Sequence, residues 1–132
     1  MGWSHRKPII ERLSAASGEA TLYNTIIVRW DAHAVRLDHG GYRSQTTLNG
    51  FHHVAVEARK PFNVFRNQGV WYVATRTSGV TFVMPFDHGL PAFPCSVPQT
   101  ATDEAWWNAW AEVCTLANRA ARWKNPLKDG KP

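Results

Sequence analysis

Hydrophobic and polar residues first form a clear pattern over residues 25–30 and 34–38. The segment 25–30 is rich in β-branched side chains, which favour strands. In the segment 34–38, Val35 and Leu37 face one way and the polar residues face the other. That alternation is typical of an antiparallel sheet with one buried face. The two segments therefore predict a pair of half-buried strands, joined by a short turn.

Three more strands are predicted over residues 62–66, 70–75 and 81–86. They are separated by Asn67-Gln68-Gly69 and Thr77-Ser78-Gly79. Both separators hold the glycine and polar residues that tight turns require. These segments are therefore expected to form an antiparallel meander.

A first helix is predicted over residues 8–17. Pro8 suits the first turn of a helix, and Gly18 is a suitable stop. Apolar residues recur at helical spacing between them. They are Ile9, Ile10, Leu13 and Ala16.

A second helix is predicted over residues 46–58, with Thr46 or Thr47 as its N-cap. Pro61 closes this segment. Its apolar positions fall on one helical face. They are Leu48, Phe51, Ala55 and Ala58.

A third helix is predicted to begin at Thr102-Asp103-Glu104 and to end near residue 123. Acidic residues at its start and basic residues at its end suit the helix dipole. The proline-containing residues 87–101 are predicted to be a connecting loop.

Together these elements predict an α+β fold with a small antiparallel sheet of about five strands. The helix over residues 46–58 packs on one face, and a Trp-rich helix closes the chain. At 132 residues the chain fits a single domain. Its expected parts are an N-terminal helix within 1–18, an α+β core over 22–90, a C-terminal helix over 102–124 and a tail over 125–132.

Composition and charge indicate a soluble protein that stays inside the cell. The first ten residues lack the apolar stretch of a secretory signal, and no run approaches the roughly 20 apolar residues that span a bilayer. Cys95 and Cys114 are expected to be free thiols. The net charge of +5 favours contact with polyanions, although it is not concentrated in a dense Lys/Arg run.

The most distinctive candidate site is the entrance to the second predicted helix. Backbone N–H groups at a helix N-terminus attract phosphate or carboxylate, and Arg43 would add positive charge. The alternative is that Gly40 and Gly41 only let the chain turn and a threonine caps the helix. The predicted anion-binding residues are Gly40, Gly41, Tyr42, Arg43, Thr46, Thr47 and Arg66.

Aromatic and basic residues on the predicted meander form a second candidate. Sheet faces of this kind can stack bases while arginines hold phosphates. Packing in the core is the alternative use of the same aromatic rings. The residues are Phe65, Arg66, Trp71, Tyr72, Arg76 and Phe82.

Trp106 and Trp107 form a predicted partner surface on the C-terminal helix. Neighbouring helical residues point about 100° apart, so either the helix is buried broadly or one of these two rings is exposed for a host, phage or self protein. Tryptophan is enriched among interface anchors. Trp110 begins a stripe that continues through Val113 and Ala117, so it is predicted to be the most buried of the three rings.

No sequence pattern indicates a catalytic residue, a metal site or a cofactor. The chain has no HxxxH, HExxH, CxxC, GxSxG or Gly-rich phosphate motif. The tripeptide Asp-His-Gly occurs at 38–40 and 87–89, where it also suits turns. Histidines from separate segments could still converge on a metal beside Asp38 and Asp87. They are His39, His52 or His53, and His88.

The central segment, roughly residues 22–90, resembles a group of short, uncharacterised tailed-phage proteins. The resemblance lies in residues 23–25, 37–42, 46–49, 62–65 and 69–73, which read YNT, LDHGGY, TTLN, FNVF and GVWYV. The chain departs from the group at Leu48, where a basic residue is usual. The resemblance implies a phage origin and a setting in the host cytoplasm or the virion, and it implies no catalytic residue.

Three functions follow as hypotheses. The first is a non-catalytic phage accessory protein that binds an anionic partner, either nucleic acid or a nucleotide. The second is a protein-interaction module, such as an inhibitor of a host or defence protein or a small virion component. The third is a small metal-dependent hydrolase. Steep salt dependence of binding would favour the first.

Overall fold

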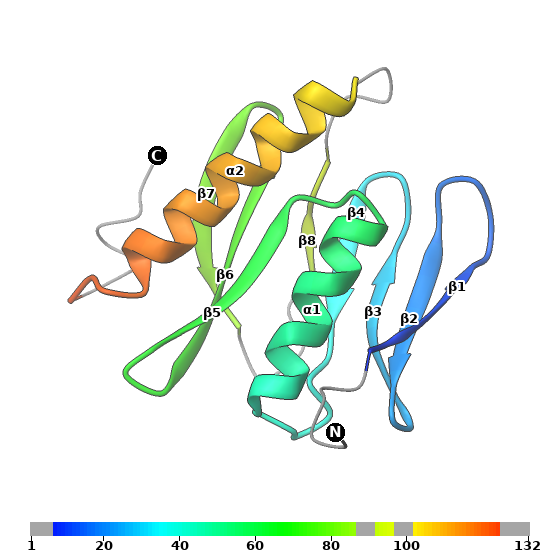
Figure 1. The fold of residues 1–132 in the computed structure, drawn as a ribbon, viewed down its shortest axis with the longest axis horizontal. Helices are drawn as coiled ribbons and strands as arrows, with labels where there is room; N and C mark the ends of the chain where they lie inside the picture. The colour runs from blue at the N-terminus through cyan, green and yellow to red at the C-terminus, as the bar shows by residue number, and fades with distance from the viewer. Residues whose placement is uncertain (1–6, 87–91, 97–101, 125–132) are drawn as a thin grey trace.

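The computed structural model describes residues 7–86, 92–96 and 102–124, which form eight strands and two helices (Figure 1). In chain order these are β1 (Ile9–Arg12), β2 (Gly18–Leu22), β3 (Thr25–Trp30), β4 (Ala34–Leu37), α1 (Gln45–Glu57), β5 (Phe62–Asn67), β6 (Val70–Thr77), β7 (Val80–Pro85), β8 (Ala92–Pro94) and α2 (Asp103–Ala120). None of the described helices is both long and apolar enough to cross a membrane. The predicted tail over 125–132 and the tripeptide at 87–89 lie outside the described residues.

The strands form two antiparallel sheets, which confirms the predicted α+β class. One sheet has the order β1-β2-β3-β4-β8, and the other has the order β5-β6-β7. All five predicted strands form, and the predicted meander is the three-stranded sheet. The sequence did not show that α1 separates the first predicted pair from the meander, nor that β8 extends the larger sheet at its far edge.

The predicted N-terminal helix is wrong, because residues 8–17 instead contribute β1 and a turn that leads into β2. Ile9 and Leu13 are exposed, so the apolar spacing does not mark a buried helical face. Gly18 is the first residue of β2 and lies beneath the indole of Trp30. A Cβ at Gly18 would lie 2.7 Å from Trp30 Cη2 and 2.8 Å from the Glu11 carbonyl oxygen. Gly18 is therefore needed for close packing within the sheet and is not a helix stop.

The second predicted helix forms as α1, but its cap is Ser44 and not Thr46 or Thr47. The Ser44 Oγ accepts a hydrogen bond from the Thr47 N–H at 3.3 Å, and the Ser44 carbonyl accepts one from the Leu48 N–H at 3.1 Å. Ser44 has the extended backbone that an N-cap requires, so the helix begins one residue earlier than predicted.

The three-stranded sheet is buried on both faces. On one face, Val64, Trp71 and Val73 join the main core with α1 and the larger sheet. On the other, Phe65 and Ala74 pack against α2. In Figure 1, α2 crosses in front of this sheet while α1 lies between the two sheets. The face that could have stacked bases is therefore covered by a helix, which excludes Phe65 and Trp71 from an open stacking platform.

Asn67 at the end of β5 fixes the far end of α2. Its Nδ2 donates hydrogen bonds to the carbonyl oxygens of Ala120 at 2.8 Å and Trp123 at 2.6 Å. Carbonyls at a helix C-terminus lack partners within the helix, so a buried amide that satisfies two of them holds the helix end in place. The β5–β6 turn and the end of α2 are therefore neighbours.

Candidate anion-binding site

The loop between β4 and α1 makes a tight turn that presents Tyr42 and Arg43 to solvent. Asp38 Oδ1 accepts a hydrogen bond from the Gly40 N–H at 2.7 Å. Gly40 and Gly41 have positive φ angles of 62° and 84°, which side chains rarely tolerate. Tyr42 is 60% exposed, and Arg43 is also exposed. The paired glycines therefore fix the loop so that both side chains project beside the start of α1.

The two predicted threonines have different positions. Thr46 is half-buried, whereas Thr47 is buried and its hydroxyl lies 3.3 Å from the Ser44 Oγ. Because the Thr47 N–H is already bound by the cap, Thr47 supports the helix and does not face a ligand. The first turn of α1 carries no acidic residue, so no carboxylate neutralises the positive end of its dipole.

Arg66 on β5 lies beside the start of α1, as the predicted site requires. Its guanidinium donates a hydrogen bond to Gln45 Oε1 at 2.8 Å. The arginine is exposed, and a neutral amide leaves its charge uncompensated. Arg43 and Arg66 therefore flank the first residue of α1, one from the preceding loop and one from the neighbouring strand.

The C-terminal end of α2 adds three exposed basic residues nearby. Asn67 binds Ala120 and Trp123, so the end of α2 lies on the face of β5 opposite to the one from which Arg66 reaches Gln45, at the same end of the strand. We call the resulting group the basic end of the molecule. It consists of Arg43, Arg66, Arg119, Arg122 and Lys124. In Figure 1 it corresponds to the start of α1, the β5–β6 turn and the far end of α2, toward the lower left.

Carboxylates are paired with arginines elsewhere in the described chain. The three ion pairs are Arg29–Glu19 at 3.4 Å, Arg59–Asp103 at 2.6 Å and Arg76–Glu112 at 2.8 Å. Within residues 7–86, 92–96 and 102–124, none of the five residues of the basic end has a carboxylate partner. The carboxylate closest in sequence to Arg43 is Asp38, which accepts a hydrogen bond from the Gly40 N–H. Among the described residues, basic side chains without a carboxylate partner are therefore found at this end.

A cleft of about 390 Å³ opens beside Arg43. It lies between the loop that precedes α1 and the β5–β6 turn. Its walls combine one arginine, three aromatic rings and two glycines whose Cβ positions face open space. The lining residues are His39, Gly41, Arg43, Gly69, Val70, Trp71 and Phe86.

His39 is held rigidly in the wall of this cleft. Its ring stacks on Phe86 at 5.2 Å between centroids and meets Trp71 edge-on at 5.6 Å. Its Nδ1 accepts a hydrogen bond from the Gly41 N–H at 2.9 Å, which a protonated Nδ1 could not do. Burial lowers the pKa of His39, and the nearby charge of Arg43 lowers it further. His39 is therefore neutral at pH 7 and shapes the loop.

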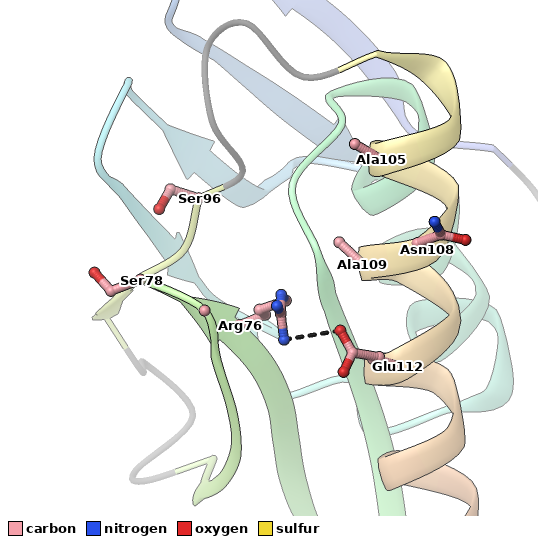
Figure 2. Close-up of a pocket in the computed structure, with 8 residues that line it drawn as sticks. Arg76, Ser78, Ser96, Ala105, Asn108, Ala109 and Glu112 are labelled. Carbon is pink, nitrogen blue, oxygen red and sulfur yellow. Dashed lines mark ion pairs between the residues drawn. The ribbon is translucent and has the colours of Figure 1, made fainter.

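A larger cavity of about 590 Å³ lies at the other end of the three-stranded sheet. Figure 2 shows Arg76 of β6 and Glu112 of α2 pointing toward one another across it. Arg76 also donates a hydrogen bond to Thr81 Oγ1 at 2.9 Å. Because Glu112 neutralises its charge, Arg76 does not take the phosphate-holding role considered from the sequence.

The sequence matches a known protein family. A family model described as the Kyanoviridae Gp96 protein matches residues 7–92. The chain belongs to this phage protein family. The match extends beyond the resemblance over residues 22–90, and it takes in β1 and the whole of the cleft lining. No match was found among curated proteins or among solved structures.

The family match ends before α2, whose tryptophans occupy three different environments. Trp106 is 1% exposed and Trp107 is 51% exposed. Trp110 is half-buried and stacks on Trp106 at 6.0 Å. The prediction that Trp110 is the most buried ring is therefore wrong. Trp106 lies inside the molecule, and Trp107 alone of the predicted pair faces solvent.

Histidines and cysteines do not gather in the described part of the chain. His52 Nε2 lies 2.9 Å from the Val64 carbonyl oxygen, so this ring joins α1 to β5. Among the residues described, no three His, Cys, Asp or Glu side chains could share a metal ion, while Asp87 and His88 lie outside those residues. Cys95 and Cys114 are both free thiols, as expected.

The sequence did not predict the cleft, although several of its residues lie in motifs that the sequence analysis identified. His39, Gly69 and Trp71 all lie within the motifs that the family resemblance rested on. Those motifs come from two loops far apart in the chain, at 37–42 and 69–73, and the fold brings them together. Both motifs belong to the same family pattern, and this could have indicated that they form one site.

Proposed function

We propose that this phage-family protein is an accessory protein that binds nucleic acid through the basic end. The observation that carries the proposal is the position of Arg43 and Arg66, both exposed and without a carboxylate partner among the described residues, on either side of the start of α1. Such an arrangement suits a phosphate, because a helix N-terminus adds partial positive charge to that of the two guanidinium groups.

The basic residues of α2 carry less weight in this proposal. Arg119 lies in the last turn of α2, where a cation stabilises the helix dipole whether or not a ligand binds. Arg122 and Lys124 follow it and extend the positive surface. Arg43 and Arg66 have no such structural task, because they lie at the positive end of α1. Their charge is therefore better explained by an anionic partner.

The experiment is a fluorescence titration of a labelled single-stranded oligonucleotide with the wild-type protein and with Arg43→Ala and Arg66→Ala. Each variant should bind about tenfold more weakly, the equivalent of about 1.4 kcal/mol for one lost phosphate contact. Arg36→Ala is the matched control, since Arg36 is exposed on β4 of the larger sheet. Equal affinity for all four proteins would contradict the proposal.

A protein partner that binds at Trp107 is the second candidate. An indole that is half exposed on a helix is an unusual surface feature, and tryptophan is enriched at interface centres. The partner would be a host or defence protein that this chain inhibits, or a neighbouring virion component. Binding through Trp107 would depend little on salt, whereas binding through the basic end would depend on it strongly.

A further inference from the structure

We infer that the cleft beside Arg43 holds a nucleobase, so that the ligand of the basic end is an unpaired nucleotide and not duplex. This inference rests on the proposed function and names the ligand more closely. Its starting point is the cleft itself, about 390 Å³ in volume and lined by aromatic rings next to an arginine. Pockets for small ligands begin at about 300 Å³, so a nucleotide-sized ligand fits the scale.

The walls of the cleft suit a flat ring. Trp71 and Phe86 are buried, at 5% and 8% exposed, and form the floor of the cleft, on which the half-buried ring of His39 stacks. The surface open to a ligand comes from His39, Arg43 and Val70. Base faces pack on aromatic side chains in proteins that bind single strands, and the contact tolerates any base. His39 is fixed by the Gly41 N–H, so the cleft is already formed without a ligand.

The mouth of the cleft is bordered by two glycines at tight turns. Gly41 and Gly69 have φ angles of 84° and 81°, and a Cβ at either position would meet no atom within 4 Å. Tyr42 is exposed beside the mouth and offers a further ring. Neither glycine therefore places a side chain across the mouth between the loop and the β5–β6 turn.

The charges beside the cleft fit the phosphate of the same nucleotide. Arg43 lines the cleft, and Arg66 lies next to the start of α1. A base in the cleft would therefore have its phosphate within the basic end. In a duplex the base faces are covered by their neighbours, so only an unpaired nucleotide can place its ring there.

The test compares oligonucleotides with and without bases. We expect the wild-type protein to bind a ten-residue oligothymidylate at least about tenfold more tightly than an abasic strand with the same number of phosphates. It should also prefer the oligothymidylate to a duplex of equal length. Equal binding of the abasic strand or the duplex would overturn the inference and leave polyanion binding intact. Failure of all three to bind would overturn the proposed function as well.

Val70→Trp provides a variant that fills the cleft. Val70 lines the cleft and is 51% exposed, and tryptophan is tolerated in strands. The variant should lose the preference for base-containing DNA and bind the abasic strand as the wild type does. Val80→Trp is the matched control. It follows Ser78-Gly79 as Val70 follows Gln68-Gly69, with the same positive φ angles, and it is 42% exposed.

Free thymidine monophosphate separates the two sources of an unpaired nucleotide. If the free monophosphate displaces the oligothymidylate from the wild type but not from Val70→Trp, the cleft binds a free nucleotide. If competition requires the strand, the cleft takes one residue of a single-stranded nucleic acid. Competition that is unchanged in Val70→Trp would place the base elsewhere and overturn the inference.

Discussion

Small side chains on one face of α2 decide which tryptophan is buried. The inward face of the helix consists of Trp106, Ala109, Val113, Ala117 and Ala120. The alanines let α2 approach the three-stranded sheet closely, so there is room for one large ring only near the start of the helix. The apolar stripe that begins at Trp110 correctly indicated that Val113 and Ala117 face inward. It could not show how closely the helix approaches the sheet.

Trp106→Ala should therefore destabilise the protein most among the three tryptophan variants. A fully buried indole leaves a large cavity, and such truncations cost about 3–5 kcal/mol. Trp107→Ala should cost less than about 1 kcal/mol, because the ring is half exposed. Urea unfolding monitored by circular dichroism measures both values. Equal losses for Trp106 and Trp107 would contradict the assigned positions.

The buried thiol of Cys95 should make stability depend on alkaline pH. Burial raises the pKa of Cys95 from its ordinary value of 9.0 to about 12. Between these values the unfolded chain loses the thiol proton and the native chain keeps it, so stability falls as pH rises above about 9. Unfolding free energies at pH 8 and pH 10 should differ less in Cys95→Ala than in the wild type. An identical difference would show that the native thiol ionises freely.

At the scale of elements, alternation predicted β4, whereas β-branched and aromatic residues between turn residues predicted β3 and the meander strands. The strands β3 and β4 and the three strands of the meander were found within a few residues of their ends. The helix predicted over residues 8–17 was wrong because β1 is an exposed edge strand. The spacing of its apolar residues therefore does not indicate a buried face. The strand β8 has three residues and two of them are exposed, which is too little pattern to detect.

Gly18→Ala tests whether the β1–β2 hairpin depends on close packing. The added methyl would overlap Trp30 and the Glu11 carbonyl, and overpacking of this kind costs about 1–3 kcal/mol. The double variant Gly18→Ala/Trp30→Leu should lose less stability than the sum of the two single variants, because the clash with the indole is removed. Thermal melts of the single and double variants measure this coupling. Purely additive losses would show that the indole does not constrain Gly18.

At the scale of the whole molecule, the end opposite the basic end carries charges of both signs, with Asp103 paired to Arg59 and Asp31 near Lys60. Asp31 follows β3, Glu57 ends α1, and Asp103 and Glu104 begin α2. In Figure 1 these element ends lie opposite the basic end. The sequence shows the basic residues scattered over the chain, and only the topology gathers five of them. Composition alone therefore suggests a polyanion partner as a hypothesis, but it does not indicate which surface would bind one.

The candidate site was predicted in part for the same reason. Gly40, Gly41 and Arg43 were identified because turn chemistry and helix entrances are local features. Arg66 was predicted as a site residue from a separate segment of the chain. Its hydrogen bond to Gln45 places it beside the start of α1. The cleft was not predicted, because it forms where the loop before α1 meets the β5–β6 turn, and the sequence does not specify that contact.

The salt dependence of oligonucleotide binding tests the central claim most directly. Each phosphate contact on a single strand contributes about −0.7 to the slope of log affinity against log salt. The Arg43→Ala/Arg66→Ala double variant should therefore have a slope shallower than that of the wild type by about 1.4, with an unchanged melting temperature. A wild-type slope near zero, or the same slope in the double variant, would contradict nucleic-acid binding at the basic end.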